Sequence, residues 1–179
     1  LEATWKDIGF TSCPNFAEAC REFDAFAQTL ESEGVTLRYL PEAAETDPDS
    51  IYTHDPVTTI ADGLVGCHMG KTNRRPEVAA IEAWSQAGGS RLTGHIGAPA
   101  SLEGGDLIWL DPDTVAVGIG FRSNSEGARR LATLTSLTVI EVPLPYWNGP
   151  ADCLHLMSLI SPLADDLALV YRRLLPVPF

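Results

Sequence analysis

Residues Glu103–Gly120 read EGGDLIWLDPDTVAVGIG, and this stretch decides the fold class. Two runs within it, Leu107–Leu110 and Thr114–Ile119, are rich in large apolar and β-branched residues, which favour strands. The intervening Asp111-Pro112-Asp113 is typical of a tight turn, because Asp and Pro both stabilise turn conformations. We therefore expect two antiparallel strands joined as a hairpin.

The segment after this hairpin completes a unit, and the unit recurs along the chain. We expect a helix over Ser125–Leu134 and a strand over Leu137–Val142, so the order is strand, strand, helix, strand. The same order is predicted upstream over four segments: Ile51–Thr53, Leu64–His68, Pro76–Gln86 and Arg91–Ile96. A third unit begins with strands over Leu154–Ile160 and Leu167–Tyr171. Units of about 50 residues that cannot bury their faces alone predict an α/β repeat architecture, in which each unit packs on its neighbours.

The N-terminal part of the chain predicts one helix and one strand. Five apolar residues recur at helical spacing between Pro14 and Gly34: Phe16, Cys20, Phe23, Phe26 and Leu30. We expect this stripe to pack into the core rather than to bind a cofactor. Val35–Tyr39 alternates apolar and more polar residues and predicts a strand, and residues 42–49 predict an acidic loop.

Length and composition predict a single globular domain over residues 1–179. No run approaches the roughly 20 apolar residues that span a bilayer, and the first residues lack the features of a signal peptide, so we expect no membrane role. The four cysteines are scattered, without the density of a disulfide scaffold. We therefore expect reduced thiols and a cytoplasmic location.

The two ends of the sequence break the repeat. The third unit stops at Phe179, where its helix would be due, and the first has no preceding hairpin. We expect a chain cut at the C-terminus, and at the N-terminus as well, so that the ring of units is open. Because an open ring exposes apolar faces, we expect a homo-oligomer or binding of the missing C-terminal segment.

Carboxylates and one imidazole recur where the first strand of each unit begins or ends. Asp49 and Asp55 bracket one such strand, Glu103 and Asp106 open the next, and His155 lies in the third. Equivalent strands of a pseudosymmetric ring converge on its axis, so we expect these side chains to line one pocket. Carboxylates suit a planar cation, and the formal charge of −12 would attract one, whereas it excludes nucleic acid as a partner.

Other classes of site are not indicated by the sequence. His54, His68 and His95 show no ligand spacing, so we expect no metal. Gly104 and Gly105 let the backbone approach a ligand closely or adopt a positive φ, but no Lys-Ser/Thr pair follows them, which excludes a phosphate loop.

Five motifs then occur in a characteristic order. They are Asp49-Ser50-Ile51-Tyr52-Thr53-His54-Asp55; Met69-Gly70-Lys71 with Arg74-Arg75-Pro76-Glu77; Glu103-Gly104-Gly105-Asp106; Gly120-Phe121-Arg122-Ser123-Asn124-Ser125-Glu126-Gly127; and Cys153-Leu154-His155-Leu156. In this order and rough spacing, over nearly the whole chain, the sequence resembles dimethylarginine dimethylaminohydrolases. The resemblance implies a fivefold pseudosymmetric α/β propeller of the pentein type, shared with arginine deiminases and amidinotransferases.

The resemblance also implies roles for individual residues. Asp55 matches the acid that grips the guanidinium, with Asp49 a secondary contact, and Glu103 matches the carboxylate that orients the histidine. His155 matches the general acid and base. A further pair, Arg74 and Arg122, matches the arginines that hold the carboxylate of the amino acid. No cofactor is implied, and the expected ligand is a small guanidino amino acid.

The implied reaction needs a cysteine nucleophile. In the family it lies close to the C-terminus, whereas no cysteine here follows Cys153, so we expect it outside these residues. Cys153 itself is two residues before His155, and we favour a buried structural thiol over a nucleophile paired with that histidine. Arginine deiminases carry an acid two positions after the histidine, where this chain has Met157, which favours a methylated substrate.

We therefore expect a hydrolase that converts a dimethylarginine-like substrate to citrulline and an amine through a covalent thiouronium intermediate. An arginine deiminase or amidinotransferase relative, and a cation-binding module without chemistry, remain alternatives. On position alone we would favour a buried core histidine for His155, and the order of the motifs reverses this preference; Asp55 would suit the end of a strand.

Overall fold

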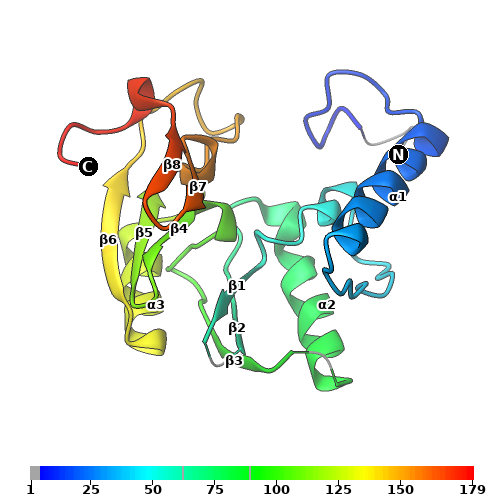
Figure 1. Cartoon of the computed structure of the whole chain (residues 1–179), viewed down its shortest axis with the longest axis horizontal. Coiled ribbons are helices and arrows are strands. Elements are labelled where there is room, and N and C mark those ends of the chain that lie inside the picture. Colours follow the sequence, from blue (N-terminus) through cyan, green and yellow to red (C-terminus); the bar gives the residue numbers. More distant parts are fainter. Residues whose placement is uncertain (1–4, 62, 89) are drawn as a thin grey trace. The chain divides into compact units, whose positions relative to one another are not determined.

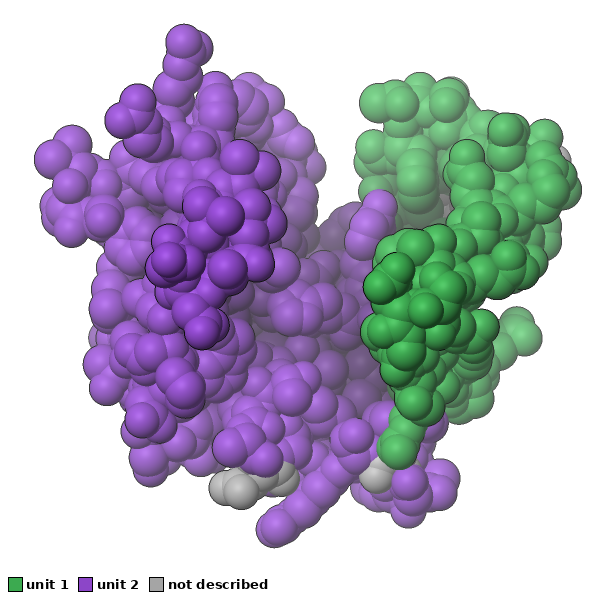
Figure 2. All heavy atoms as spheres, in the orientation of Figure 1, with its two compact units in different colours: residues 1–51 green, residues 52–179 purple. Residues whose placement is uncertain are grey.

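The computed structural model describes residues 5–61, 63–88 and 90–179. Two compact units, Leu1–Ile51 and Tyr52–Phe179, are coloured separately in Figure 2. The prediction of a single domain stays a prediction. No helix among the described residues is long and apolar enough to cross a membrane. All four cysteines are free thiols.

The first unit contains one α-helix, α1 (Phe16–Ser32), as predicted. Asn15 caps it, because its side-chain oxygen accepts a 3.1 Å hydrogen bond from the backbone N–H of Glu18. The prediction that the apolar stripe packs into a core is wrong: Phe16, Phe23 and Phe26 are exposed. Residues 35–39, predicted as a strand, are irregular, so the described part of this unit offers no sheet on which the stripe could pack.

The second unit begins with a complete strand, strand, helix, strand module (Figure 1). Its elements are β1 (Val57–Ile60), β2 (Gly63–Gly66), α2 (Arg75–Gln86) and β3 (Leu92–His95). β1 pairs antiparallel with β2, and β2 pairs parallel with β3. The prediction of a strand over residues 51–53 is wrong, because residues 48–51 form a 3-10 turn and the Asp55 N–H donates to Tyr52 O, so the chain turns before β1.

The second module follows the prediction closely. Its elements are β4 (Leu107–Asp111), β5 (Thr114–Ile119), α3 (Ser125–Thr135) and β6 (Thr138–Pro143). β4 and β5 form the predicted hairpin, and β5 pairs parallel with β6. Asn124 fixes the start of α3, since its side-chain oxygen accepts hydrogen bonds from the N–H groups of Gly127 and Ser101.

A third hairpin consists of β7 (Ile160–Ala164) and β8 (Leu167–Val170). The predicted first strand over residues 154–160 is wrong for most of its length, because residues 156–158 form a 3-10 turn. His155 therefore precedes this turn instead of lying in a strand. The turn is held from outside, since the Leu156 N–H donates a 3.0 Å hydrogen bond to Asp106 Oδ1.

Neighbouring modules share their cores, as the repeat predicts. One cluster joins the first module to the second: Val65, Cys67, Ile96, Ala100, Leu102, Leu107, Val115, Val117, Ala128 and Leu131. A second cluster joins the second module to the third hairpin: Ile108, Ala116, Val142, Leu156, Leu159 and Ile160. This packing fixes the starts of β1, β4 and β7 relative to one another.

Candidate active site

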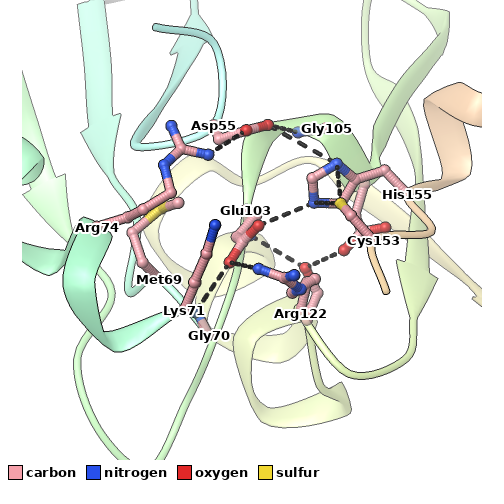
Figure 3. Close-up of polar contacts among 12 residues, drawn as sticks. Asp55, Met69, Gly70, Lys71, Arg74, Glu103, Gly105, Arg122, Cys153 and His155 are labelled. Atoms are coloured by element: carbon pink, nitrogen blue, oxygen red, sulfur yellow. Dashed lines mark hydrogen bonds and ion pairs between the residues drawn. The ribbon is translucent and has the colours of Figure 1, made fainter. Parts of the chain in front are cut away.

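Three of the predicted polar residues meet where the modules begin. Asp55 lies two residues before β1, Glu103 lies just before a 3-10 turn that leads into β4, and His155 lies just before the turn that leads to β7. Figure 3 shows their side chains pointing toward one another. The predicted convergence of equivalent positions is therefore confirmed for these three, although the residues precede the strands rather than lie in them.

Glu103 and His155 form the centre of the site. His155 Nε2 lies 2.8 Å from Glu103 Oε2, and Glu103 is wholly buried. The other oxygen, Oε1, accepts a 2.9 Å hydrogen bond from the Gly70 N–H and lies 3.8 Å from an Arg122 nitrogen. Burial alone would raise the pKa of Glu103, but the hydrogen bond and charge of His155, with Arg122, hold that pKa below its usual value. Glu103 is therefore ionised at neutral pH.

The neighbouring acceptors keep His155 protonated. Burial lowers the pKa of an imidazole, but hydrogen bonds to Cys153 and Glu103 and the charge of Asp106 outweigh burial and raise the pKa of His155 to about 10. At neutral pH His155 therefore carries a proton on each ring nitrogen. The proton on Nε2 faces Glu103, and Nδ1 itself lies 3.9 Å from Asp55 Oδ1.

Asp55 is held by a buried arginine. Its Oδ2 accepts a 2.6 Å hydrogen bond from Arg74 Nη1, and its Oδ1 accepts one from the Gly105 N–H at 3.1 Å. Arg74 also donates two hydrogen bonds of 2.8 Å to Glu77. Burial opposes its charge, but the bonds to Glu77 and Asp55 raise the pKa of Arg74 above its usual value. The donors of Arg74 thus face protein carboxylates, which favours a role in fixing Asp55.

The two glycines of the Glu-Gly-Gly-Asp motif are required by close contacts, not by positive φ. A Cβ on Gly105 would overlap His155 Nδ1 and Asp55 Oδ1, and a Cβ on Gly104 would overlap the carbonyl oxygen of His54. That these glycines let the backbone approach a ligand stays a prediction, and the close contacts of their backbone in the structure are with His54, Asp55 and His155.

Asp106 is wholly buried, and each of its oxygens accepts a hydrogen bond from the protein. Oδ2 accepts a 2.6 Å hydrogen bond from Ser123 Oγ, and Oδ1 accepts the bond from Leu156 N–H. Burial raises the pKa of Asp106 to about 6, against the opposing effects of His155 and of these hydrogen bonds. The predicted contact between Asp106 and the ligand stays a prediction, but this geometry favours a structural task. The sequence had suggested no role for Ser123, and its position inside the fourth motif was the only signal.

The remaining residues with predicted roles are Arg122, Met157 and Asp49. Arg122 is mostly buried and lies beside Glu103. Met157 is 43% exposed. Asp49 belongs to the first compact unit, in the turn Pro48–Ile51, and its contact with a ligand stays a prediction.

The prediction of a buried Cys153 is wrong. This residue is exposed, and its sulfur lies 3.6 Å from His155 Nδ1 and 3.9 Å from Nε2 (Figure 3). The physical reason is that residues 153–155 have no regular secondary structure, so the strand with a core-facing side that the prediction assumed does not form.

The donor atoms of Asp55, Glu103 and His155 all lie within 4.8 Å of one another, which is compatible with a bound metal ion. The same atoms suit an organic cation, because an ionised carboxylate accepts hydrogen bonds from a planar guanidinium. Most of them are already engaged by Arg74, Gly105 or each other. The expected absence of a metal stays a prediction.

Comparison with known proteins places this site in a family. A family model described as N,N dimethylarginine dimethylhydrolase, eukaryotic, matches residues 3–177. The chain belongs to the dimethylarginine dimethylaminohydrolase family. A relative named N(G),N(G)-dimethylarginine dimethylaminohydrolase from Streptomyces coelicolor is 31% identical over 173 residues, which cover 89% of this chain and 64% of that protein.

Solved structures show the same fold. A dimethylarginine dimethylaminohydrolase from Pseudomonas aeruginosa, a cysteine-to-serine mutant complexed with citrulline, is 26% identical with a TM-score of 0.76 over 89% of this chain and 62% of that chain. The N-terminal domain of the cyanobacterial arginine dihydrolase ArgZ, bound to product, has a TM-score of 0.79 over 96% of this chain and 64% of that chain at 18% identity, a likeness of fold alone. The predicted pentein-type α/β fold is thereby confirmed. The chain spans less than two thirds of the length of each of these relatives.

Proposed function

We propose that the protein containing this chain hydrolyses a substituted arginine, such as a dimethylarginine, to citrulline and an amine. The observation that carries the proposal is the 2.8 Å hydrogen bond between the buried Glu103 and His155, beside the carboxylate of Asp55. Such a group of side chains binds a guanidinium and also supplies a proton donor next to it. Membership of the dimethylarginine dimethylaminohydrolase family supports the choice of substrate.

Substrate binding divides between two groups of residues. Asp55 and Glu103 accept hydrogen bonds from the guanidinium, where burial makes charge-assisted bonds strong, and Asp49 adds a secondary contact. Arg122 holds the carboxylate of the amino acid. Arg74 is the weaker candidate for that second task, because Asp55 and Glu77 already occupy its donors.

The reaction proceeds in two steps. A cysteine thiolate from outside these residues attacks the guanidinium carbon, and the C–N bond to the leaving amine breaks while His155 donates its proton to that nitrogen. The product is a thiouronium and a neutral imidazole. His155 then takes a proton from water as the hydroxide adds to the same carbon, and collapse of this adduct releases citrulline and the thiolate while the proton of the added hydroxyl passes to solvent. Glu103 stabilises the charged form of His155 throughout.

The direct test is product analysis with the intact protein. Incubation with asymmetric dimethylarginine should release citrulline and dimethylamine in equal amounts, and His155→Asn should abolish both. Ammonia from arginine would indicate a deiminase, and transfer of the amidino group to an added amine would indicate an amidinotransferase. The exposed Met157 favours the first outcome, because an apolar side chain tolerates a methylated nitrogen.

A second candidate is a cation-binding module without chemistry. The observation that favours it for this chain alone is that the carboxylates and the histidine lie here, whereas no cysteine of this chain follows Cys153. Calorimetry with a dimethylarginine on this chain distinguishes the two, since binding that weakens sharply in Asp55→Ala or Arg122→Ala, without turnover by the intact protein, would support the module.

A further inference from the structure

Ser123 and Asp106 form a buried pair that is hydrogen-bonded to the segments carrying Glu103 and His155. Both side chains have no exposed surface, and Ser123 Oγ donates a 2.6 Å hydrogen bond to Asp106 Oδ2. A hydroxyl that donates to an ionised carboxylate makes a short, charge-assisted bond, which is stronger than a neutral one. The relative position of the two side chains is therefore well fixed.

This pair holds the backbone on both sides of the catalytic bond. Ser123 Oγ accepts a 3.0 Å hydrogen bond from the N–H of Glu103, and Asp106 Oδ1 accepts one of 3.0 Å from the N–H of Leu156, the residue after His155. Glu103 and His155 come from different modules, 52 residues apart in the sequence. The Ser123–Asp106 pair thus links the two segments through three consecutive hydrogen bonds.

The space around this pair leaves it little freedom. A Cβ on Gly118 in β5 would lie 2.7 Å from Asp106 Oδ1 and 3.0 Å from Leu156 Cβ. Asp106 is therefore packed against the β5 backbone and cannot shift toward it. Because both of its oxygens already accept hydrogen bonds from the protein, its carboxylate is not free to reach a ligand.

We propose that Ser123 and Asp106 are positioning residues, which hold Glu103 and His155 at hydrogen-bonding distance for proton transfer. The inference rests on the proposed function for the reaction that this bond serves. A displacement of about 1 Å in a catalytic group lowers turnover by about 100-fold, so a linkage of this kind has a measurable effect. The role assigned to Asp106 is therefore no longer contact with the ligand but the positioning of Glu103 and His155.

The test uses Ser123→Ala, with Ser125→Ala as the matched control. Ser125 lies two residues away and also donates to a carboxylate, that of Glu141, but on the surface. NMR of the His155 imidazole reports its titration midpoint and the exchange of its Nε2 proton with solvent. We expect the midpoint to fall by at least about one unit from its value of about 10 in Ser123→Ala, and to stay unchanged in Ser125→Ala.

Asp106→Asn is the second variant, in case Ser123→Ala does not fold. The amide keeps an oxygen for the Leu156 N–H, but its nitrogen is a donor, so the Ser123 hydroxyl loses its acceptor. The lost charge of Asp106 also lowers the His155 midpoint, so here the readout is faster exchange of the Nε2 proton. In the intact protein both variants should lower kcat by about 100-fold with KM changed by less than about threefold.

The outcomes separate this inference from the proposed function. A folded Ser123→Ala or Asp106→Asn with the exchange rate of the wild type would overturn the inference and leave only a structural role. An equal fall of kcat and rise of KM, without any change at His155, would overturn it as well. If the wild-type protein makes no citrulline but the Nε2 exchange still accelerates in both variants, the proposed function fails while the positioning of His155 by Ser123 and Asp106 is upheld.

Discussion

The carboxylate of Glu103 is shared between His155 and the backbone of Gly70. Oε2 lies 2.8 Å from His155 Nε2, and Oε1 accepts the Gly70 N–H at 2.9 Å. A carboxylate gripped on one oxygen by a rigid backbone donor has a fixed orientation, so its other oxygen fixes the plane of the imidazole. Glu103 thus orients the proton donor and, with Cys153 and Asp106, stabilises its charged form.

Glu103→Gln should separate the effect of the carboxylate charge of Glu103 from the effect of its side-chain shape. The amide retains the size of the side chain but no longer stabilises an imidazolium, so the His155 midpoint should fall below about 10 and kcat should fall by about 100-fold or more. NMR titration and steady-state kinetics measure the two effects. Glu82→Gln is the matched control, because Glu82 also pairs with a histidine, His95, in an exposed position. An equal change in both variants would contradict the assigned role of Glu103.

Gly105→Ala should damage the site while leaving the fold largely intact. The added methyl would overlap His155 Nδ1 and Asp55 Oδ1, so the two side chains must separate. We expect dimethylarginine binding to weaken by at least about tenfold, which corresponds to about 1.4 kcal/mol. Calorimetry measures it, and Gly97→Ala is the control, since a Cβ there meets no atom within 4 Å. Unchanged affinity in Gly105→Ala would mean that the ligand binds elsewhere.

The modules could be predicted from the sequence because their signals are local. The hairpin of β4 and β5 follows from two runs of large apolar and β-branched residues around Asp111-Pro112-Asp113, and α3 and β6 follow from the segments just after it. The segment before β1 could not be predicted. Its short apolar run suits a strand, but the chain forms a 3-10 turn there and an Asp-Pro step leads into β1. Residues 154–159 were also predicted as a strand. They form a turn that is held by a long-range hydrogen bond from Leu156 N–H to Asp106, which no local pattern reveals.

The site itself was predictable in part. Asp55, Glu103 and His155 could be chosen because they recur at equivalent places in the modules. The partners of Arg74 could not be predicted, because nothing in the sequence indicates that its buried guanidinium binds Asp55 rather than a substrate. The roles of Ser123 and Asp106 depend on hydrogen bonds between residues 17 to 50 positions apart, which no local pattern reveals.

Arg74→Ala should destabilise the protein as well as lower its activity. Removal of the guanidinium takes away the cation that Asp55 and Glu77 share in a buried position, and breaking such a pair costs about 3–5 kcal/mol. Chemical denaturation measures the loss. Arg129→Ala is the control, because Arg129 pairs with Glu126 on the exposed face of α3 and should change the midpoint little. A stable Arg74→Ala with weak substrate binding alone would instead favour a contact with the ligand.

Cys153→Ala should lower the titration midpoint of His155. The sulfur lies 3.6 Å from Nδ1 and, together with Glu103, raises the pKa of the imidazole against burial. NMR titration of the variant should give a midpoint below about 10. Cys20→Ala, which removes another exposed thiol, should have no effect on His155. A midpoint equal to that of the wild type would show that the sulfur does not stabilise the imidazolium.

The pH dependence of stability provides a last measure of the same histidine. The folded pKa of His155 is about 10, whereas an unfolded histidine titrates near 6.5, so the folded state holds the proton more tightly. This stabilisation is fully present below about pH 6.5 and is lost as the pH rises through about 10. The unfolding free energy of the wild type should therefore fall by a few kcal/mol over this window relative to that of His155→Asn, as measured by urea denaturation. His95→Asn controls for the loss of an exposed histidine, and a constant difference between the wild type and His155→Asn across the window would contradict the raised pKa.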